Sequence, residues 1–251
     1  MTQRIALITG GSRGLGRSMA LHLAQAGVDI IFTYQSNQAA AQEVVAQVEG
    51  LGRRARALQL DTGKSGGFAG FAEQVGAVLA GWGGDRFDIL VNNAGAGLHA
   101  SLLEVTEAQF DGIVAMHVKP VVFLTAALLP LLKDGGRILN VSSGLTRFSL
   151  PGYGVYAAAK GAVEVLTRYQ AREFAGRGIT VNTLAPGAIE TDFGGGAVRD
   201  NADLNRMVAG MTALGRVGQP DDIGGAVAAL LAEGNGWMTG QRVEISGGML
   251  L

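Results

Sequence analysis

The chain has 251 residues, 48% of them hydrophobic, which excludes an intrinsically disordered protein. Its 20 basic and 21 acidic residues leave a formal net charge of −1, which gives no reason to expect a nucleic-acid or anionic-membrane partner. The sequence contains no cysteine, so disulfides, thiol catalysis and cysteine-based zinc sites are excluded, and its three histidines are too scattered to predict another metal site.

Short apolar runs alternate along the chain with longer amphipathic segments. The predicted strands are residues 5–9, 28–34, 55–60, 88–92, 137–141, 179–184 and 242–245. The predicted helices are residues 15–26, 39–51, 68–79, 107–132, 157–175 and 221–232, the fourth bent or broken by Pro120 and Pro130. This alternation predicts an α/β fold: a doubly wound, Rossmann-like parallel sheet of about seven strands with helices on both faces.

No linker divides the chain, so residues 1–251 are expected to form a single catalytic domain. The Gly-rich stretch 193–202 is expected to be a mobile loop, and residues 189–211 a lid over the substrate pocket. The apolar run near the N-terminus is too short for a signal peptide, and the longest apolar stretch, 120–132, is too short to span a bilayer. We therefore expect a cytoplasmic protein without a membrane partner.

A glycine-rich turn joins the first predicted strand to the first predicted helix. Its residues are Thr9, Gly10, Gly11, Ser12, Arg13, Gly14, Leu15 and Gly16. Small residues let the backbone approach a pyrophosphate, and the start of the helix offers it free N–H groups. The spacing is G-x-x-x-G-x-G rather than the commoner G-x-G-x-x-G, so an ordinary strand-to-helix turn is the alternative interpretation.

The end of the second predicted strand favours NADP(H) over NAD(H). Sites for NAD usually place an acidic residue there, roughly 20 residues past the turn, to bind the ribose hydroxyls. This chain has Tyr34 at that position, and no carboxylate in the three residues that follow. Arg13 lies inside the turn, where its guanidinium could bind a 2′-phosphate, although it could also be merely solvated.

Tyr156 and Lys160 are spaced i, i+4, which places them on one face of a helix. An ammonium group near a phenol lowers the pKa of the phenol from its reference value of about 10, so Tyr156 could donate a proton to a carbonyl or accept one from an alcohol. A surface Tyr–Lys pair is the alternative. Ser143 ends the fifth predicted strand, and Asn92–Gly95 and Pro186–Gly187 also lie at strand ends, so these sites fall on one edge of the sheet.

Together these motifs resemble the short-chain dehydrogenase/reductase family, in its single-domain branch, and look closest to the 3-oxoacyl-carrier-protein-reductase-like members. The resemblance covers nearly the whole chain, and the set is specific although each piece alone is not. It also rests on Asp61, Asn182, Thr191, Arg216–Ile223, Thr239–Gln241 and Ser246–Gly248.

The resemblance implies an oxidoreductase that moves a hydride between NADP(H) and a small-molecule carbonyl or alcohol substrate, without a metal. It implies that Tyr156 is the acid/base, that Lys160 binds the nicotinamide ribose and lowers the pKa of Tyr156, and that Ser143 hydrogen-bonds the substrate oxygen. Besides Tyr156 and Lys160, the implied cofactor-binding residues are Gly10, Ser12, Arg13, Gly14, Leu15, Gly16, Tyr34, Asp61, Thr62, Asn93, Ala94, Gly95, Pro186, Gly187, Ile189 and Thr191. Members are mostly tetramers, so we expect a homotetramer or homodimer paired through residues 105–132 and 157–175 and the C-terminal strand.

The chain departs from the family at His117, where members commonly carry an asparagine that holds a water of a proton relay behind the lysine. An imidazole can donate and accept hydrogen bonds, so His117 could be a catalytic relay residue; equally, it could only fill the site. His99 and Arg147 lie in loops after cofactor-side strands and could contact a polar substrate, although solvated positions are favoured.

Two other functions remain open from the sequence. One is a catalytically silent dinucleotide-binding sensor or regulatory subunit, against which the presence of Ser143, Tyr156 and Lys160 argues. The other is a sugar-nucleotide epimerase or dehydratase, but only 60 residues follow Thr191, too few for a separate substrate domain. The residues Phe148, Leu150, Tyr153 and Phe193 predict a partly apolar pocket without identifying its substrate.

Overall fold

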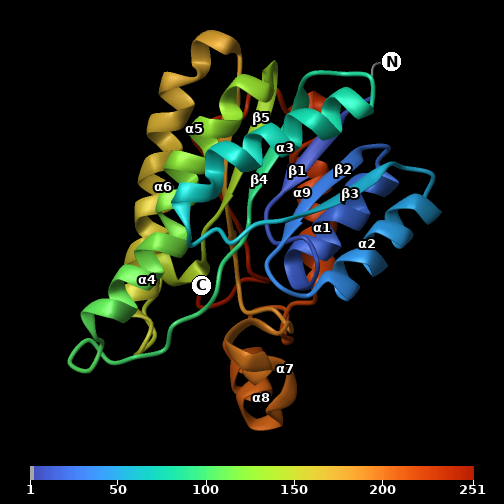
Figure 1. Cartoon of the computed structure of the whole chain (residues 1–251). Coiled ribbons are helices and arrows are strands. Elements are labelled where there is room, and N and C mark those ends of the chain that lie inside the picture. The colour runs from blue at the N-terminus through green and yellow to red at the C-terminus, as the bar shows by residue number, and fades with distance from the viewer. Residues whose placement is uncertain (1–2) are drawn as a thin grey trace.

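The structure is a computed structural model that describes residues 3–251. Seven strands form one sheet in the order β3-β2-β1-β4-β5-β6-β7, and every neighbouring pair is parallel (Figure 1). The strands are β1 (Ile5–Ile8), β2 (Asp29–Tyr34), β3 (Ala55–Gln59), β4 (Phe87–Asn92), β5 (Leu132–Val141), β6 (Thr180–Pro186) and β7 (Arg242–Ile245). The predicted doubly wound parallel sheet is therefore confirmed, with the direction of strand order reversing between β1 and β4.

Helices cover both faces of this sheet (Figure 1). They are α1 (Gly14–Gln25), α2 (Gln38–Gly50), α3 (Phe68–Gly81), α4 (Glu107–His117), α5 (Thr125–Leu128), α6 (Gly154–Glu173), α7 (Ala197–Asp200), α8 (Ala202–Gly210) and α9 (Pro220–Leu230). Successive side chains of a strand point to opposite faces, so Ala6 and Ile8 pack with α1, α2 and α9, whereas Ile5 and Leu7 pack with α3, α5 and the end of α6.

Helices α1 and α9 pack closely because α9 presents a glycine to α1. A Cβ added at Gly224 would lie 2.3 Å from Ser18 Oγ and 2.5 Å from His22 Nδ1. The next residue, Gly225, has only His22 ring atoms near its Cβ position, at 3.7 Å or more. The absence of a side chain at Gly224 therefore sets the distance between the two helices.

The region predicted as one bent helix, residues 107–132, is interrupted as its prolines suggested. Helix α4 ends at His117, a π-helical turn spans Pro120–Leu124, and α5 and a 3-10 turn at Leu129–Leu131 follow. Strand β5 then starts at Leu132, five residues before the predicted start at Arg137. Sequence reasoning missed its first half because Lys133–Gly136 are polar or glycine, and the pairing of β4 with β5 is irregular at the same place.

By length and composition, the helical run of residues 107–131 is long enough to cross a membrane, in contrast to the shorter apolar stretch 120–132 within the sequence. Its residues Leu124 and Leu128 are fully buried in the core against α3 and the sheet. A core helix passes the same test, so the run is weak evidence for a membrane span.

The mobile loop expected at residues 193–202 is wrong in part, because this segment is largely helical. A 3-10 turn at Phe193–Gly196 leads into α7 and then α8, which project together at one end of the molecule (Figure 1). The side chain of Asn201 caps α8 by accepting hydrogen bonds from the N–H groups of Asp203 and Leu204, both at 3.0 Å. The glycines that suggested a loop, Gly194–Gly196, lie inside this turn and adopt positive φ angles.

Candidate active site

The predicted site residues gather where four parallel strands end. The register pairs Ile8 with Val91, Asn92 with Asn140, and Val141 with Leu184, so β1, β4, β5 and β6 end at a common edge. The glycine-rich turn, Asn93–Gly95, Ser143 and Pro186–Gly187 follow these strand ends. One edge of the sheet thus carries residues that are up to 177 positions apart in the sequence, from Gly10 to Gly187.

The turn after β1 requires its glycines. Gly10 and Gly14 have φ angles of +69° and +53°, and a Cβ at Gly16 would lie 2.1 Å from the carbonyl oxygen of Gly10. Ser12 and Leu15 complete the turn into α1. The bare backbone at the start of α1 is therefore a cradle of the kind that fits a dinucleotide pyrophosphate.

Asn93 and Ala94 hold this turn against β4. The Asn93 side chain donates to the carbonyl of Thr9 at 2.8 Å, while Thr9 Oγ1 accepts from the N–H groups of Asn93 and Ala94 at 2.9 and 3.0 Å. On the far side of the turn, the methyl group of Thr191 lies 3.5 Å from the Cβ position of Gly14. The base of the predicted lid thus lies directly over the glycine-rich turn.

The residues predicted to recognise the adenosine half lie around the ends of β2 and β3. Arg13 precedes α1, its side chain is 75% exposed, and its guanidinium lies 3.7 Å from a carboxylate oxygen of Asp192. Half-buried Tyr34 ends β2. The Asp61 carboxylate accepts from the N–H of Gly63 at 3.0 Å, next to the buried Thr62.

Helix α6 brings Tyr156 and Lys160 beside Ser143. Both α6 side chains are buried, and the Ser143 hydroxyl lies close enough to the Tyr156 phenol to lower its pKa. Lys160 Nζ lies 5.8 Å from the centre of the Tyr156 ring and donates to the carbonyl of Val141 at 2.8 Å. The three predicted catalytic side chains therefore form one cluster.

The expected lowering of the Tyr156 pKa by Lys160 is not found in the protein alone. Burial raises the pKa of Tyr156 above its ordinary value, and the neighbouring Ser143 hydroxyl offsets this only in part. Burial also lowers the pKa of Lys160 to about 7, and the ammonium group is directed to Val141. Tyr156 is accordingly a neutral phenol, the form that can donate a proton.

His117 lies directly behind this cluster. Its Nε2 is 2.8 Å from the carbonyl oxygen of Ala96, which can only accept, so Nε2 carries the proton and Nδ1 is an acceptor. Nδ1 is buried and has no hydrogen-bond partner among residues 3–251, and the ring stands edge-on to Tyr156 at 5.3 Å. Burial, and then the charge of Lys160, lower the pKa of His117 to about 3.

The His117 ring also depends on Gly95, because a Cβ there would lie 2.4 Å from His117 Cε1. From the predicted lid, Phe193 places its ring 5.7 Å from that of Tyr156, and Ile189 pairs with Gly218. Gly187 is similarly constrained, since its Cβ would lie 2.8 Å from Ser246 Cα.

Neither loop residue outside the cluster is simply solvated. Arg147 forms a bidentate ion pair with Glu244, at 2.7 and 2.9 Å, and also donates to the carbonyls of Met249 and Leu250. The His99 ring stands edge-on to that of Tyr153 at 5.0 Å. Arg147 is thus engaged within the protein rather than free for a substrate.

Sequence reasoning missed a buried polar network beneath the site. Asn92 donates to Asn140 and Thr125, and Asn140 donates in turn to Thr167 and Gln170, at distances from 2.8 to 3.0 Å. The one signal available was Asn140 itself, a polar residue inside an otherwise apolar strand segment.

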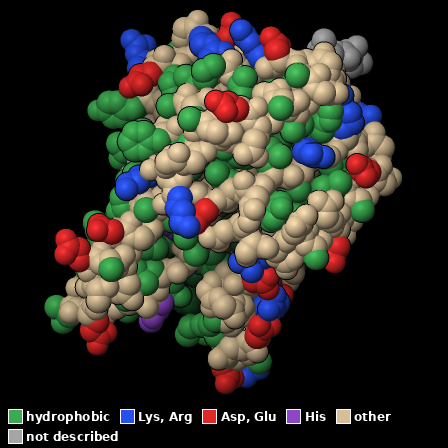
Figure 2. Space-filling model, viewed as in Figure 1, with side chains coloured by type: hydrophobic (Ala, Val, Ile, Leu, Met, Phe, Trp, Pro, Cys, Tyr) green, Lys and Arg blue, Asp and Glu red, His purple; other side chains and the backbone are tan. Residues whose placement is uncertain are grey.

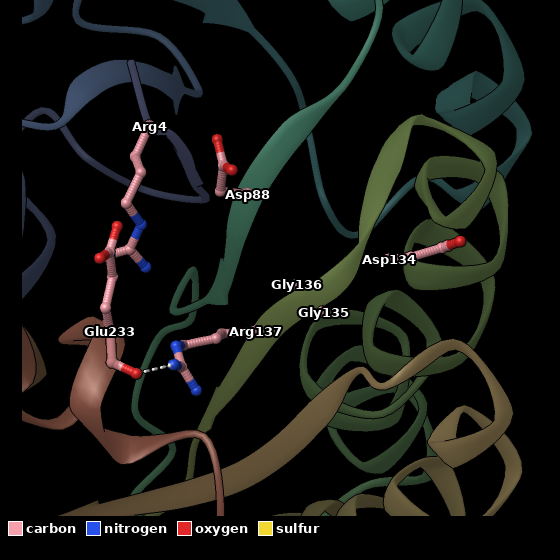
Figure 3. Close-up of a pocket in the computed structure, with 7 residues that line it drawn as sticks. All are labelled: Arg4, Asp88, Asp134, Gly135, Gly136, Arg137 and Glu233. Atoms are coloured by element: carbon pink, nitrogen blue, oxygen red, sulfur yellow. Dashed lines mark hydrogen bonds between the residues drawn. The ribbon is translucent and has the colours of Figure 1, made fainter. Parts of the chain in front are cut away.

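A separate pocket lies at the opposite edge of the sheet, where β1, β4 and β5 begin (Figure 3). Its buried Arg137 donates to the carbonyls of Glu233 and Asn235, at 2.8 and 3.2 Å, and Arg4 donates to that of Leu231 at 2.9 Å. These arginines satisfy carbonyl groups that follow α9, so helix capping accounts for them.

Comparison with known proteins agrees with this geometry. A family model described as enoyl-(acyl carrier protein) reductase matches residues 10–250. The chain belongs to the short-chain dehydrogenase/reductase family. It is therefore an oxidoreductase, as the resemblance in its motifs implied.

Among members of this family, tetrahydroxynaphthalene reductase PfmaG of Pestalotiopsis fici is 35% identical over 256 residues, which cover 98% of this chain and 91% of that protein. The solved structure of the angucycline C-6 ketoreductase LanV with bound NADP has a TM-score of 0.93 at 36% identity and covers 98% of this chain and 95% of that one. The promiscuous reductase LugOII, which catalyses keto-reduction at C1 during lugdunomycin biosynthesis, has a TM-score of 0.93 at 38% identity and covers 99% and 98%.

Proposed function

We propose that this short-chain dehydrogenase/reductase uses NADPH to reduce a ketone, with Tyr156 as the proton donor. The observation that carries the proposal is the cluster of Ser143, Tyr156 and Lys160 at the carboxyl edge of the sheet, beside a glycine cradle at the start of α1. Because its pKa is raised, Tyr156 carries its proton at neutral pH, and a carbonyl oxygen that receives a hydride needs a proton.

NADPH, when bound, supplies the hydride. The Ser143 hydroxyl donates a hydrogen bond to the ketone oxygen and holds it near Tyr156, which transfers its phenolic proton to that oxygen. The ammonium group of Lys160 stabilises the phenolate that remains. His117, through its Nδ1 acceptor beside Lys160, is the residue we assign to the relay that returns a proton to Tyr156.

The residues assigned to the cofactor are those implied by the family motifs. The cradle of Gly10–Gly16 would take the pyrophosphate, Arg13 the 2′-phosphate, and Thr191 with Ile189 the carboxamide end. Two features support NADP(H) over NAD(H): Tyr34 in place of an acid at the end of β2, and the bound NADP of the relative LanV.

For the substrate we propose a fused-ring aromatic ketone. The ring of Phe193, from the proposed lid, lies 5.7 Å from that of Tyr156, and two further aromatic residues stand in the adjoining loops, Tyr153 before α6 and Phe148 after β5. Such rings stack on flat aromatic substrates. The named relatives support this class, since they act on tetrahydroxynaphthalene or belong to angucycline and lugdunomycin biosynthesis.

We further propose that residues 1–251 form one catalytic domain, that residues 189–211 act as its lid, and that the protein is a homodimer or homotetramer. Large apolar side chains are exposed on α4, the π-helical turn and α6, namely Phe110, Val122, Phe123 and Val165. Hydrophobic side chains are visible along the side that α4, α5 and α6 cover (Figure 2). Light scattering at micromolar concentration should give a mass of two or four chains.

The test of the function is the Tyr156→Phe variant. It keeps the ring but removes the proton donor, so we expect ketone-dependent NADPH oxidation, followed at 340 nm with 1-tetralone and larger fused-ring ketones, to fall by roughly 10²–10⁴-fold. The dissociation constant for NADPH should stay within about threefold, since no charge is lost. The matched control is Tyr169→Phe, which removes a hydroxyl from an exposed position of the same helix. Retention of most of the turnover by Tyr156→Phe would remove Tyr156 from the reaction.

A further inference from the structure

Helix α6 carries a third polar residue on the face of Tyr156 and Lys160. Glu164 follows Lys160 by one further step of four residues, and its carboxylate is largely buried. Its Oε1 accepts hydrogen bonds from Ser142 Oγ at 2.8 Å and from Thr146 Oγ1 at 2.7 Å. These two donors flank Ser143 in the loop after β5, so the segment that holds Ser143 is tied on both sides to the helix that holds Tyr156.

A second group of charges supports this tie from β7. Arg242 Nε donates to Glu164 at 2.9 Å, and its Nη2 lies 3.2 Å from Thr146 Oγ1. Arg242 Nη1 donates to Glu244 at 2.8 Å, and Glu244 also pairs with Arg147. The carboxylate of Glu164 thus has a charged partner, which strengthens each hydrogen bond it accepts in this partly buried site.

We propose that Glu164 is a positioning residue, which sets the distance between the Ser143 and Tyr156 hydroxyls by clamping the 142–146 segment onto α6. The inference rests on the proposed function in that Ser143 and Tyr156 must hold one ketone oxygen together. Within residues 3–251 the Ser143 hydroxyl has one hydrogen bond, which it accepts from the N–H of Leu145 at 3.2 Å, a contact within the same loop. The backbone on either side must therefore fix its position, and a displacement of about 1 Å in such a site costs on the order of 10²-fold in rate.

The kinetic test is a double-mutant cycle of Glu164→Ala and Ser143→Ala. We expect Glu164→Ala to lower kcat by about tenfold to a hundredfold while the dissociation constant for NADPH stays within twofold. In the Ser143→Ala background, the added Glu164→Ala change should cost less than about twofold, because the residue it positions is gone. If Glu164→Ala lowers kcat as much in the Ser143→Ala background as in the wild type, the proposal is overturned, because a residue with only a general structural role lowers kcat equally in both backgrounds.

Two further variants serve as controls beside the cycle. Glu164→Gln retains an acceptor for Ser142 and Thr146 but loses the charge that pairs with Arg242, so its kcat should fall between those of the wild type and Glu164→Ala. Glu173→Gln removes a carboxylate from an exposed position of α6 and should leave kcat unchanged. Thermal melting of each variant identifies any that fails to fold.

Hydrogen exchange tests the clamp without any turnover. The amides of residues 144–148 should exchange about tenfold faster in Glu164→Gln than in the wild type or in Glu173→Gln, because two of their tethers weaken. Unchanged exchange overturns the clamp, whether or not the enzyme reduces a ketone. Conversely, faster exchange in a protein that reduces no ketone would support the clamp and reject the proposed function.

Discussion

At the scale of single residues, Arg13 is the side chain through which the chain would distinguish the two nicotinamide cofactors. It stands at the start of α1 beside the glycine cradle, mostly exposed and paired only loosely with Asp192. A 2′-phosphate would give it a stronger partner than a carboxylate 3.7 Å away. Its guanidinium has five donors in a planar fork, which suits a phosphate.

We expect Arg13→Ala to reduce the preference for NADPH over NADH by about fivefold to tenfold, or roughly 1–1.4 kcal/mol, because the exposed site screens the interaction. The measurement is the ratio of the dissociation constants for the two cofactors, obtained by fluorescence titration. Arg17→Ala, which removes an exposed arginine one turn further along α1, is the control and should leave the ratio unchanged. Equal binding of the two cofactors by the wild type would contradict the assignment.

Glu164, Arg147 and Arg242 show why part of the site escaped sequence reasoning. Tyr156 and Lys160 were predictable because their relation is local, four residues on one helix, and because strand ends reveal Ser143. The partners of Arg147, by contrast, are Glu244 and the carbonyls of Met249 and Leu250, about 100 residues away. Only the order of strands in the sheet brings β7 beside that loop, and no local pattern encodes such a pairing.

At the scale of secondary structure elements, the contact of α1 with α9 depends on one glycine. We expect Gly224→Ala to lower the free energy of unfolding by about 1–3 kcal/mol, because its Cβ would meet Ser18 and His22 at less than 3 Å. Gly225→Ala, one residue on, has room for the methyl group and should be neutral or stabilising by up to about 1 kcal/mol, as is usual within a helix. Urea unfolding of the two variants beside the wild type measures the difference. Equal stability would mean that α9 shifts freely on α1.

The helices and strands were predictable where one regular spacing of hydrophobic residues runs through the whole element. The strands of the sheet interior are unbroken apolar runs, and their positions were predicted to within a few residues. Prediction was wrong where glycine and polar residues occur in regular structure, in the first half of β5 and in residues 193–202. In both places tertiary contacts override composition: Leu132 pairs with Phe87, and Val198 of α7 packs against the cluster that contains Val208 and Met249.

At the scale of the whole molecule, His117 makes stability depend on pH. Its pKa of about 3 in the folded protein lies below the 6.5 of an ordinary histidine, so between these values the unfolded chain binds more protons. The contribution of His117 to the free energy of unfolding is therefore fully present above pH 6.5 and is lost as the pH falls toward 3. The groups that face the ring are Lys160, Tyr156 and the Ala96 carbonyl, and of these only Lys160 carries a charge in this range.

The expected size follows from about 1.4 kcal/mol per pH unit for one proton. From pH 6.5 to 4.5 the wild type should lose about 2–3 kcal/mol more than His117→Asn, which has no proton to exclude. The comparison uses the change with pH in each protein, because asparagine is smaller and lowers stability at every pH. Urea unfolding at the two pH values measures it. Parallel losses in the two proteins would show that His117 takes up its proton without cost in the folded state.

The contact between His117 and Gly95 also limits the order in which this site can change. An alanine at position 95 would collide with the imidazole, whose Cε1 lies 2.4 Å from the added carbon, so Gly95→Ala is harmful while the histidine is present. Once the side chain at 117 is as short as asparagine, the same alanine has space. The two positions are therefore epistatic: residue 95 can be enlarged without penalty only after residue 117 has become smaller, and the reverse order passes through a destabilised intermediate.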